Sequence, residues 1–103
     1  MPEPLGLLLN DFVQALRHKL DDVKVYLFGS YSKGEWIEDS DIDLIVVSDQ
    51  FLSLNIGERA RLVRGLAPKE ISFHLILYTY EEFKRARKSL SMKDIVDSCI
   101  RIV

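Results

Sequence analysis

The chain has 103 residues, of which 48% are hydrophobic and 29% charged, so it resembles one folded domain more than a disordered or fibrous protein. We expect a single domain over residues 1–103. The formal net charge of −2 gives no basic field, so strong nonspecific nucleic-acid binding is not expected. With Cys99 as the single cysteine, an internal disulfide and a thiolate zinc cluster are excluded.

The N-terminal stretch MPEPLGLLLNDF carries an acid where a signal peptide carries basic residues. No apolar run approaches the roughly 20 residues that span a bilayer. We therefore expect no membrane association and a cytoplasmic location.

The first half of the chain predicts a helix followed by two strands. Hydrophobic residues recur at helical spacing from Leu5 to Leu20, and Asp21 and Asp22 end that pattern. Residues 23–28, VKVYLF, are β-branched and aromatic, as in a strand. After the polar loop SKGEWIEDS, residues 41–48 form an apolar run. Because this run is apolar on both faces after Asp43, it predicts a central strand.

The second half predicts a helix, a strand and two further helices. Residues 56–66 have one apolar side, and residues 71–79, ISFHLILYT, read as a strand. Thr79 and Glu82 form a capping box that opens a helix through residue 90. Ser91 and Asp94 repeat that start signal before the apolar residues Met92, Ile95, Val96, Cys99 and Ile100. The predicted fold class is α+β, with a small mixed three-stranded sheet and about four helices.

Two carboxylates, Asp41 and Asp43, stand one residue apart at the start of the central strand. Strand alternation points both to the same face, about 6.6 Å apart along the strand. Ionised carboxylates this close repel each other unless a cation lies between them. Mg²⁺ suits such a place, because it prefers oxygen ligands and is often shared between carboxylates and substrate phosphates.

A Gly-Ser turn, Gly29 and Ser30, closes the strand before the carboxylates. Backbone N–H groups and a hydroxyl at such a turn can cradle a phosphate, and glycine permits close approach. Taken singly, a Gly-Ser pair usually marks a turn, and Asp-x-Asp usually caps a strand or solvates a loop. Their combination places a phosphate site beside a metal site, which is the minimum for nucleotidyl transfer.

The stretch GSYSKGEWIEDSDIDLIVV, residues 29–47, resembles the signature of the nucleotidyltransferase superfamily that includes the DNA polymerase β palm. Within it, the short chain is similar to the minimal nucleotidyltransferases, and the order of elements matches over nearly the whole chain. The resemblance implies a polymerase β palm-like fold. It also implies Mg²⁺, with Mn²⁺ as the alternative, and ATP or another nucleoside triphosphate as substrate.

The resemblance also implies roles for residues of the signature. Gly29 and Ser30 would bind the triphosphate, and Asp41 and Asp43 would bind metal. Further nucleotide contacts would come from Lys33, Gly34 and Ser40. The chain departs from the family pattern at Tyr31, where the family often has arginine, so one phosphate contact is in question.

His74 stands where the superfamily normally has a third carboxylate, on the next strand. Three interpretations remain open. The neutral imidazole can act as a general base near neutral pH. As a metal ligand it suits Mn²⁺ or Zn²⁺ better than Mg²⁺. Alternatively, it fills the acidic position of a protein that binds nucleotide and reacts slowly or not at all.

The resemblance further implies work in a complex. Minimal nucleotidyltransferases are often encoded beside small helical HEPN-type proteins, in toxin-antitoxin pairs. The first hypothesis is a metal-dependent enzyme that transfers AMP from ATP to a hydroxyl of that partner in a hetero-oligomer. The alternative is an antitoxin or adaptor that binds nucleotide, lacks turnover, and acts by protein contact alone.

Overall fold

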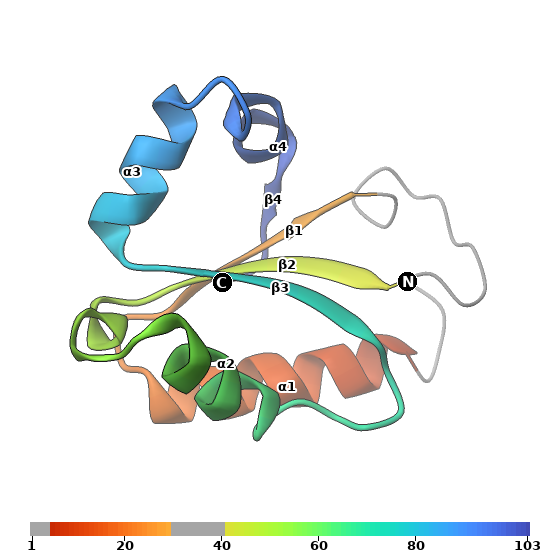
Figure 1. Cartoon of the computed structure of the whole chain (residues 1–103). Coiled ribbons are helices and arrows are strands. Elements are labelled where there is room, and N and C mark those ends of the chain that lie inside the picture. Colours follow the sequence, from red (N-terminus) through yellow and green to blue (C-terminus); the bar gives the residue numbers. More distant parts are fainter. Residues whose placement is uncertain (1–4, 30–40) are drawn as a thin grey trace.

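The computed structural model describes residues 5–29 and 41–103 as a sheet between two layers of helices (Figure 1). Helices α1 (Leu5–Lys19) and α2 (Ile56–Arg64) lie on one face of the sheet. Helices α3 (Tyr80–Lys88) and α4 (Lys93–Ser98) lie on the other. The strands are β1 (Lys24–Phe28), β2 (Ile42–Val47), β3 (Phe73–Tyr78) and β4 (Ile100–Arg101). The α+β prediction is confirmed.

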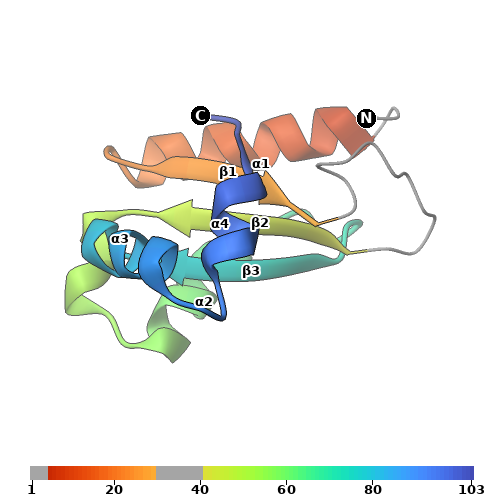
Figure 2. The same ribbon diagram turned by 90° about the horizontal axis from the view of Figure 1, so that it is seen from above.

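The sheet is mixed, with strand order β3-β2-β1-β4 in the described residues. Figure 2 shows β3, β2 and β1 side by side. Strand β2 runs antiparallel to β1 and parallel to β3. It is central, as its two apolar faces predicted, and its residues alternate between two cores. Ile42, Leu44 and Val46 belong to the core shared with α1 and α2. Ile45 and Val47 belong to the core shared with α3 and α4.

The prediction of three strands is wrong by one. The structure adds β4, and Ile100, expected on the apolar side of the last helix, lies in this strand with half of its surface exposed. The β1 edge accounts for this, because its backbone groups are available to the returning chain. The N–H group of Ile102 donates to the carbonyl of Val25 at 2.8 Å. Cys99 is a half-buried residue just after α4, packed against the core shared with α3 and α4.

Two helices begin with complete capping boxes. The predicted pair, Thr79 and Glu82, opens α3, and an unpredicted pair, Asn55 and Glu58, opens α2. The predicted cap at Ser91 is wrong, because α4 begins after Met92 without a side-chain cap. The Ser91 hydroxyl instead shares a hydrogen bond with the hydroxyl of Ser89 at 2.9 Å, a local bond that competes with helix capping.

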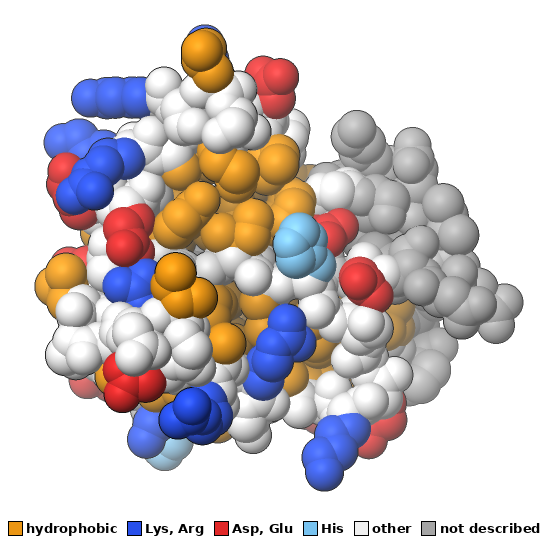
Figure 3. Space-filling view, viewed as in Figure 1, with side chains coloured by type: hydrophobic (Ala, Val, Ile, Leu, Met, Phe, Trp, Pro, Cys, Tyr) orange, Lys and Arg blue, Asp and Glu red, His pale blue; other side chains and the backbone are white. Residues whose placement is uncertain are grey.

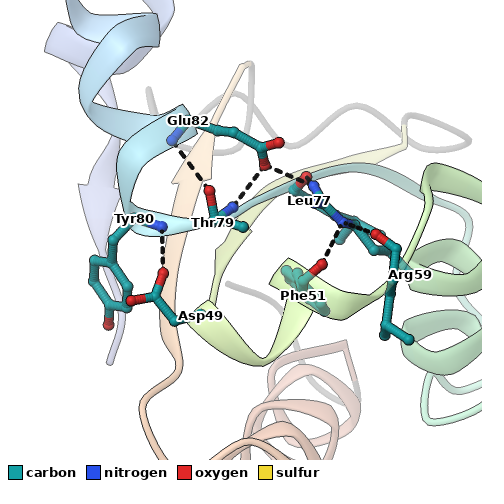
Figure 4. Close-up of polar contacts among 8 residues, drawn as sticks. Asp49, Phe51, Arg59, Leu77, Thr79, Tyr80 and Glu82 are labelled. Atoms are coloured by element: carbon teal, nitrogen blue, oxygen red, sulfur yellow. Dashed lines mark hydrogen bonds and ion pairs between the residues drawn. The ribbon is translucent and has the colours of Figure 1, made fainter.

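A short 3-10 helix, η2 (Asp49–Ser53), follows β2 and was not predicted. Ser48 caps it and donates to the Asp22 carboxylate at 2.6 Å. The Asp49 carboxylate in turn accepts from the backbone N–H of Tyr80 at 3.0 Å (Figure 4). These bonds fix the ends of β2 and β3 to their neighbours.

Among the described residues, no helix has both the length and the apolarity to cross a membrane.

Candidate functional site

Three strands bring the candidate site together at one end of the sheet. The register places Phe28, the last residue of β1, beside Asp43 of β2, and Asp43 beside His74 of β3. These three residues form a row across the sheet, on the face that carries α3 and α4. Residues widely separated in sequence are therefore neighbours because of the register between the strands.

Asp43 and His74 are in direct contact. Nδ1 of His74 lies 3.1 Å from Oδ1 of Asp43. The imidazole side chain is 59% exposed and the carboxylate 20% exposed. When Nδ1 carries the proton and donates to the carboxylate, Nε2 is left as an acceptor. The arrangement thus provides an oriented imidazole whose second nitrogen can take a proton or bind a metal ion.

Phe28 supports the imidazole from the β1 side. Its ring lies edge-on to the His74 ring, with the centroids 5.9 Å apart. Phe28 is only 6% exposed, so its ring is held by the core and gives the exposed imidazole of His74 a fixed surface to pack against. Nothing in the sequence pattern distinguished Phe28 from an ordinary core residue, and only the strand register reveals its place at the site.

Gly29 is required by the geometry around Asp43. Its φ of +73° lies in the left-handed region that favours glycine. A Cβ atom at this position would lie 2.1 Å from Oδ2 of Asp43. The carboxylate therefore has one oxygen against His74 and the other in space that only a glycine leaves open. The sequence singled out Gly29 for phosphate binding, whereas this second requirement comes from the structure.

Asp41 lies just before β2 and is exposed. The predicted nucleotide contacts Ser30, Lys33, Gly34 and Ser40 lie outside the described residues, as does Tyr31. The structure thus brings Asp43, His74 and Gly29 together at one place. The roles assigned to all these residues remain predictions.

The carboxylates of Asp41 and Asp43 are suited to a divalent cation, but the described residues do not complete a metal site. Asp41 and Asp43 carry carboxylate oxygens, the kind of ligand that Mg²⁺ prefers, and the missing side chain of Gly29 lets Oδ2 of Asp43 lie close to the backbone. Within residues 5–29 and 41–103, no three His, Cys, Asp or Glu side chains are grouped so that they could hold a metal. Among the described acidic side chains, His74 contacts Asp43, and an imidazole at this position suits Mn²⁺ better than a carboxylate would.

An open cavity of about 340 Å³ adjoins this end of β1. It is lined by Phe28 and Gly29 and, from α4, by Asp94, Ile95 and Ser98. The cavity therefore lies next to the glycine that borders Asp43. The α4 side chains were not predicted to be near the site, because the sequence gives no sign of how the last helix crosses the sheet.

Comparison with known proteins gives a family match over most of the chain. The model of the nucleotidyltransferase domain family matches residues 9–102. Two proteins of Methanocaldococcus jannaschii are similar in sequence. "Putative protein adenylyltransferase MJ0604" is 44% identical over 43 residues, which cover 40% of this chain and 43% of that protein. "Putative protein adenylyltransferase MJ1305" is 33% identical over 64 residues, covering 60% and 43% respectively. The matches thus span less than half the length of these two relatives.

Two crystal structures share the fold. A putative nucleotidyltransferase from Sulfolobus solfataricus aligns with a TM-score of 0.66 and 22% identity, over 92% of this chain and 76% of that one. A toxin-antitoxin with AMP-PNP aligns with a TM-score of 0.59 and 24% identity, over 91% of this chain and 71% of that one. At these identities the likeness extends to the fold alone.

Proposed function

The chain belongs to the nucleotidyltransferase domain family, and from that premise we propose that it transfers AMP from ATP to a hydroxyl group of a partner protein. The observation that carries the proposal is the Asp43–His74 pair at the strand ends. A carboxylate beside an oriented imidazole is suited to a reaction that needs both a cation and a proton acceptor. The names of the Methanocaldococcus relatives favour a protein as acceptor.

Each residue has a definite task in the proposed reaction. Asp41 and Asp43 hold the divalent cation, Mg²⁺ or Mn²⁺. When bound, the cation neutralises charge on the triphosphate and polarises the phosphorus under attack. Gly29, which has no side chain, leaves the place that Oδ2 of Asp43 occupies. Ser30, Lys33, Gly34 and Ser40 are proposed to hold the triphosphate.

In the proposed transfer, the acceptor oxygen forms a bond to the α-phosphorus of ATP, and the bond from that phosphorus to the bridging oxygen breaks. Pyrophosphate leaves with the bonding electrons. Nε2 of His74 accepts the hydroxyl proton, while Nδ1 stays directed at Asp43. The products are an AMP ester of the acceptor and pyrophosphate.

The proposed partner is a small helical HEPN-type protein, with this chain as the antitoxin of the pair. The toxin-antitoxin crystal structure with AMP-PNP shares the fold and motivates this part of the proposal. A second candidate function is an antitoxin that binds nucleotide and neutralises its partner by contact alone. His74 at the usual acidic position and Tyr31 at a usual basic position favour it.

The deciding experiment combines the purified chain with the HEPN-type protein encoded beside it, ATP, and either Mg²⁺ or Mn²⁺. Intact-mass spectrometry then reports whether either chain gains AMP. We expect a gain on the partner, reduced at least about 100-fold by Asp41→Asn, because a metal ligand is lost. Asp11→Asn, an exposed change on α1, is the matched control and should leave transfer unchanged.

Two outcomes separate the candidates. Undiminished transfer by Asp41→Asn would refute the metal site. A stable complex without AMP on either chain, under both metals, would favour the antitoxin that acts by contact. His74→Gln tests the imidazole: it removes the proton acceptor and keeps a polar side chain, and we expect transfer to fall at least about 100-fold with either metal.

A further inference from the structure

Among the described residues, no strand pairs with the outer edge of β3, which lies next to the candidate site. In the part of the chain that the structure describes, β3 pairs with β2 and is the outermost strand of the sheet. The N–H of Ile42 donates to the carbonyl of Ser72, and the N–H of Ser48 donates to that of Tyr78. These two bonds, with the parallel pairing, show that the backbone N–H and C=O groups of the even-numbered β3 residues point towards β2. The backbone groups of Phe73, Leu75 and Leu77 therefore point outwards.

One end of this edge is already covered. Nη1 of Arg59 donates to the outward carbonyl of Leu77 at 3.3 Å and to Glu82 at 2.6 Å (Figure 4). The uncovered part is consequently the half around Leu75, the residue that follows His74. A row of unpaired N–H and C=O groups is satisfied best by another extended backbone. This half of the edge thus has the hydrogen-bonding pattern to receive a strand.

Hydrophobic side chains gather above this edge, between β3 and the helices α3 and α4 (Figure 3). The upper apolar patch consists of the half-buried residues Ile76, Tyr78, Met92 and Ile95. The side chains of Ile76 and His74 leave β3 on the same face, two positions apart. A strand added to the edge would direct every second side chain over this patch and towards His74.

The other side of the edge is basic. A cavity of about 510 Å³ at the start of β3 is lined by Arg64, Lys69 and Phe73, with Glu70 as the one acidic residue of its lining. The alternate side chains of an added strand would face this side. Acidic side chains there would complement Arg64 and Lys69.

We propose that the β3 edge binds an extended segment of the acceptor protein and presents its hydroxyl group to His74. The segment alternates: a hydroxyl residue and an apolar residue face His74 and the upper apolar patch, and acidic residues face Arg64 and Lys69. Residues opposite each other on paired strands have Cβ atoms about 5 Å apart, which places the hydroxyl side chain next to the imidazole. The presentation step rests on the proposed function, whereas strand binding does not.

The test uses the peptide Glu-Val-Glu-Tyr-Glu-Val-Glu with capped ends, without nucleotide or metal. Amide signals of Leu75 and Leu77 are followed by NMR during titration. We expect saturable shifts at both amides and slowed hydrogen exchange at Leu75. The same peptide, N-methylated at alternate residues so that it cannot pair, should bind about tenfold more weakly or not at all.

Two variants locate the binding surface. Leu75→Pro removes an outward donor, a change that edge strands tolerate, and should weaken binding about tenfold. Because this variant can fail to fold, Ile76→Glu provides an independent test by placing a charge on the upper apolar patch, with a similar expected loss. Ile56→Glu, at a position that is 84% exposed on α2, is the matched control and should bind within about twofold of the unchanged chain.

Four outcomes would overturn the inference: no saturable peptide binding, shifts that map away from β3, binding that survives N-methylation, or a dimer of this chain that Leu75→Pro dissociates. The last result would show that a second copy occupies the edge. Since no nucleotide is present, failure of AMP transfer leaves a positive peptide result intact. Conversely, AMP transfer without peptide binding would retain the proposed function and reject this docking surface.

Discussion

The Asp43 carboxylate is enclosed by two different neighbours. One oxygen faces His74 at 3.1 Å, and the other occupies the space left by the missing Cβ of Gly29. The orientation of the carboxylate is therefore set by a hydrogen bond on one side and by absence of a side chain on the other. A change at Gly29 should act on the site through Asp43.

Gly29→Ala tests this link. The new Cβ would meet the flexible end of Asp43, so we expect the carboxylate to rotate away from His74 while the chain still folds. The left-handed backbone adds a cost of about 1–2 kcal/mol to folding. AMP transfer should fall at least about tenfold, and urea unfolding of the same variant measures the change in its stability separately.

Gly57→Ala is the control for Gly29→Ala. A Cβ at Gly57 meets only the Asn55 side chain, at an ordinary 3.5 Å. This second variant should retain transfer and stability. Equal AMP transfer by Gly29→Ala and the unchanged chain would show that transfer does not depend on the position of the Asp43 carboxylate.

At the scale of whole elements, the sequence predicted what depends on local chemistry. The helix over α1 follows from hydrophobic spacing, the start of α3 from Thr79 and Glu82, and the central place of β2 from its two apolar faces. Strand β4 could not be predicted this way, because its two residues are strand only through pairing with β1. Likewise, Asp43 and His74 appeared as separate candidates, and only the β2–β3 register makes them a pair.

The capping box of α3 yields a prediction at this scale. The Thr79 hydroxyl accepts from the N–H of Glu82, and Glu82 accepts from the N–H of Thr79 at 2.8 Å. Thr79→Ala should therefore lower the free energy of unfolding by about 1 kcal/mol in urea denaturation. Ser91→Ala should change it by less than about 0.5 kcal/mol, because Ser91 caps nothing. A loss of equal size in both variants would contradict the assignment of these caps.

Across the whole molecule, an ion pair links the two helical layers around the β3 edge. Arg59 of α2 is buried, and its guanidinium also donates to the carbonyls of Phe51 and Leu54 before it reaches Glu82 of α3. The helical spacing of residues 56–66 predicted one apolar side and did not distinguish Arg59 from the other charged residues of α2. This ion pair lies at the far end of the sheet from Asp43 and His74, and it joins the two helical layers there.

This ion pair should make stability depend on pH. Partial burial raises the pKa of Glu82, but hydrogen bonds from Arg59 and Thr79 outweigh it, so the pKa lies below its ordinary value of 4.5. A carboxylate with a lowered pKa stabilises the fold above pH 4.5, and this contribution is lost as the pH falls through the folded-state pKa. The stability difference between the unchanged chain and Glu82→Gln should shrink below about pH 4.5, measured by urea unfolding across pH. A difference that is constant with pH would contradict this role.

The two hydrogens on the Cα of Gly29 are not equivalent. The left-handed backbone disfavours an L-residue, and the hydrogen that an L-residue replaces points at Oδ2 of Asp43. A D-residue has the opposite preference and replaces the other hydrogen. A chain made by chemical synthesis with D-alanine at this position would therefore keep the backbone relaxed and the carboxylate in place. Comparing L-alanine with D-alanine at position 29 thus tests whether the site needs glycine itself or only a left-handed backbone with no Cβ directed at Asp43.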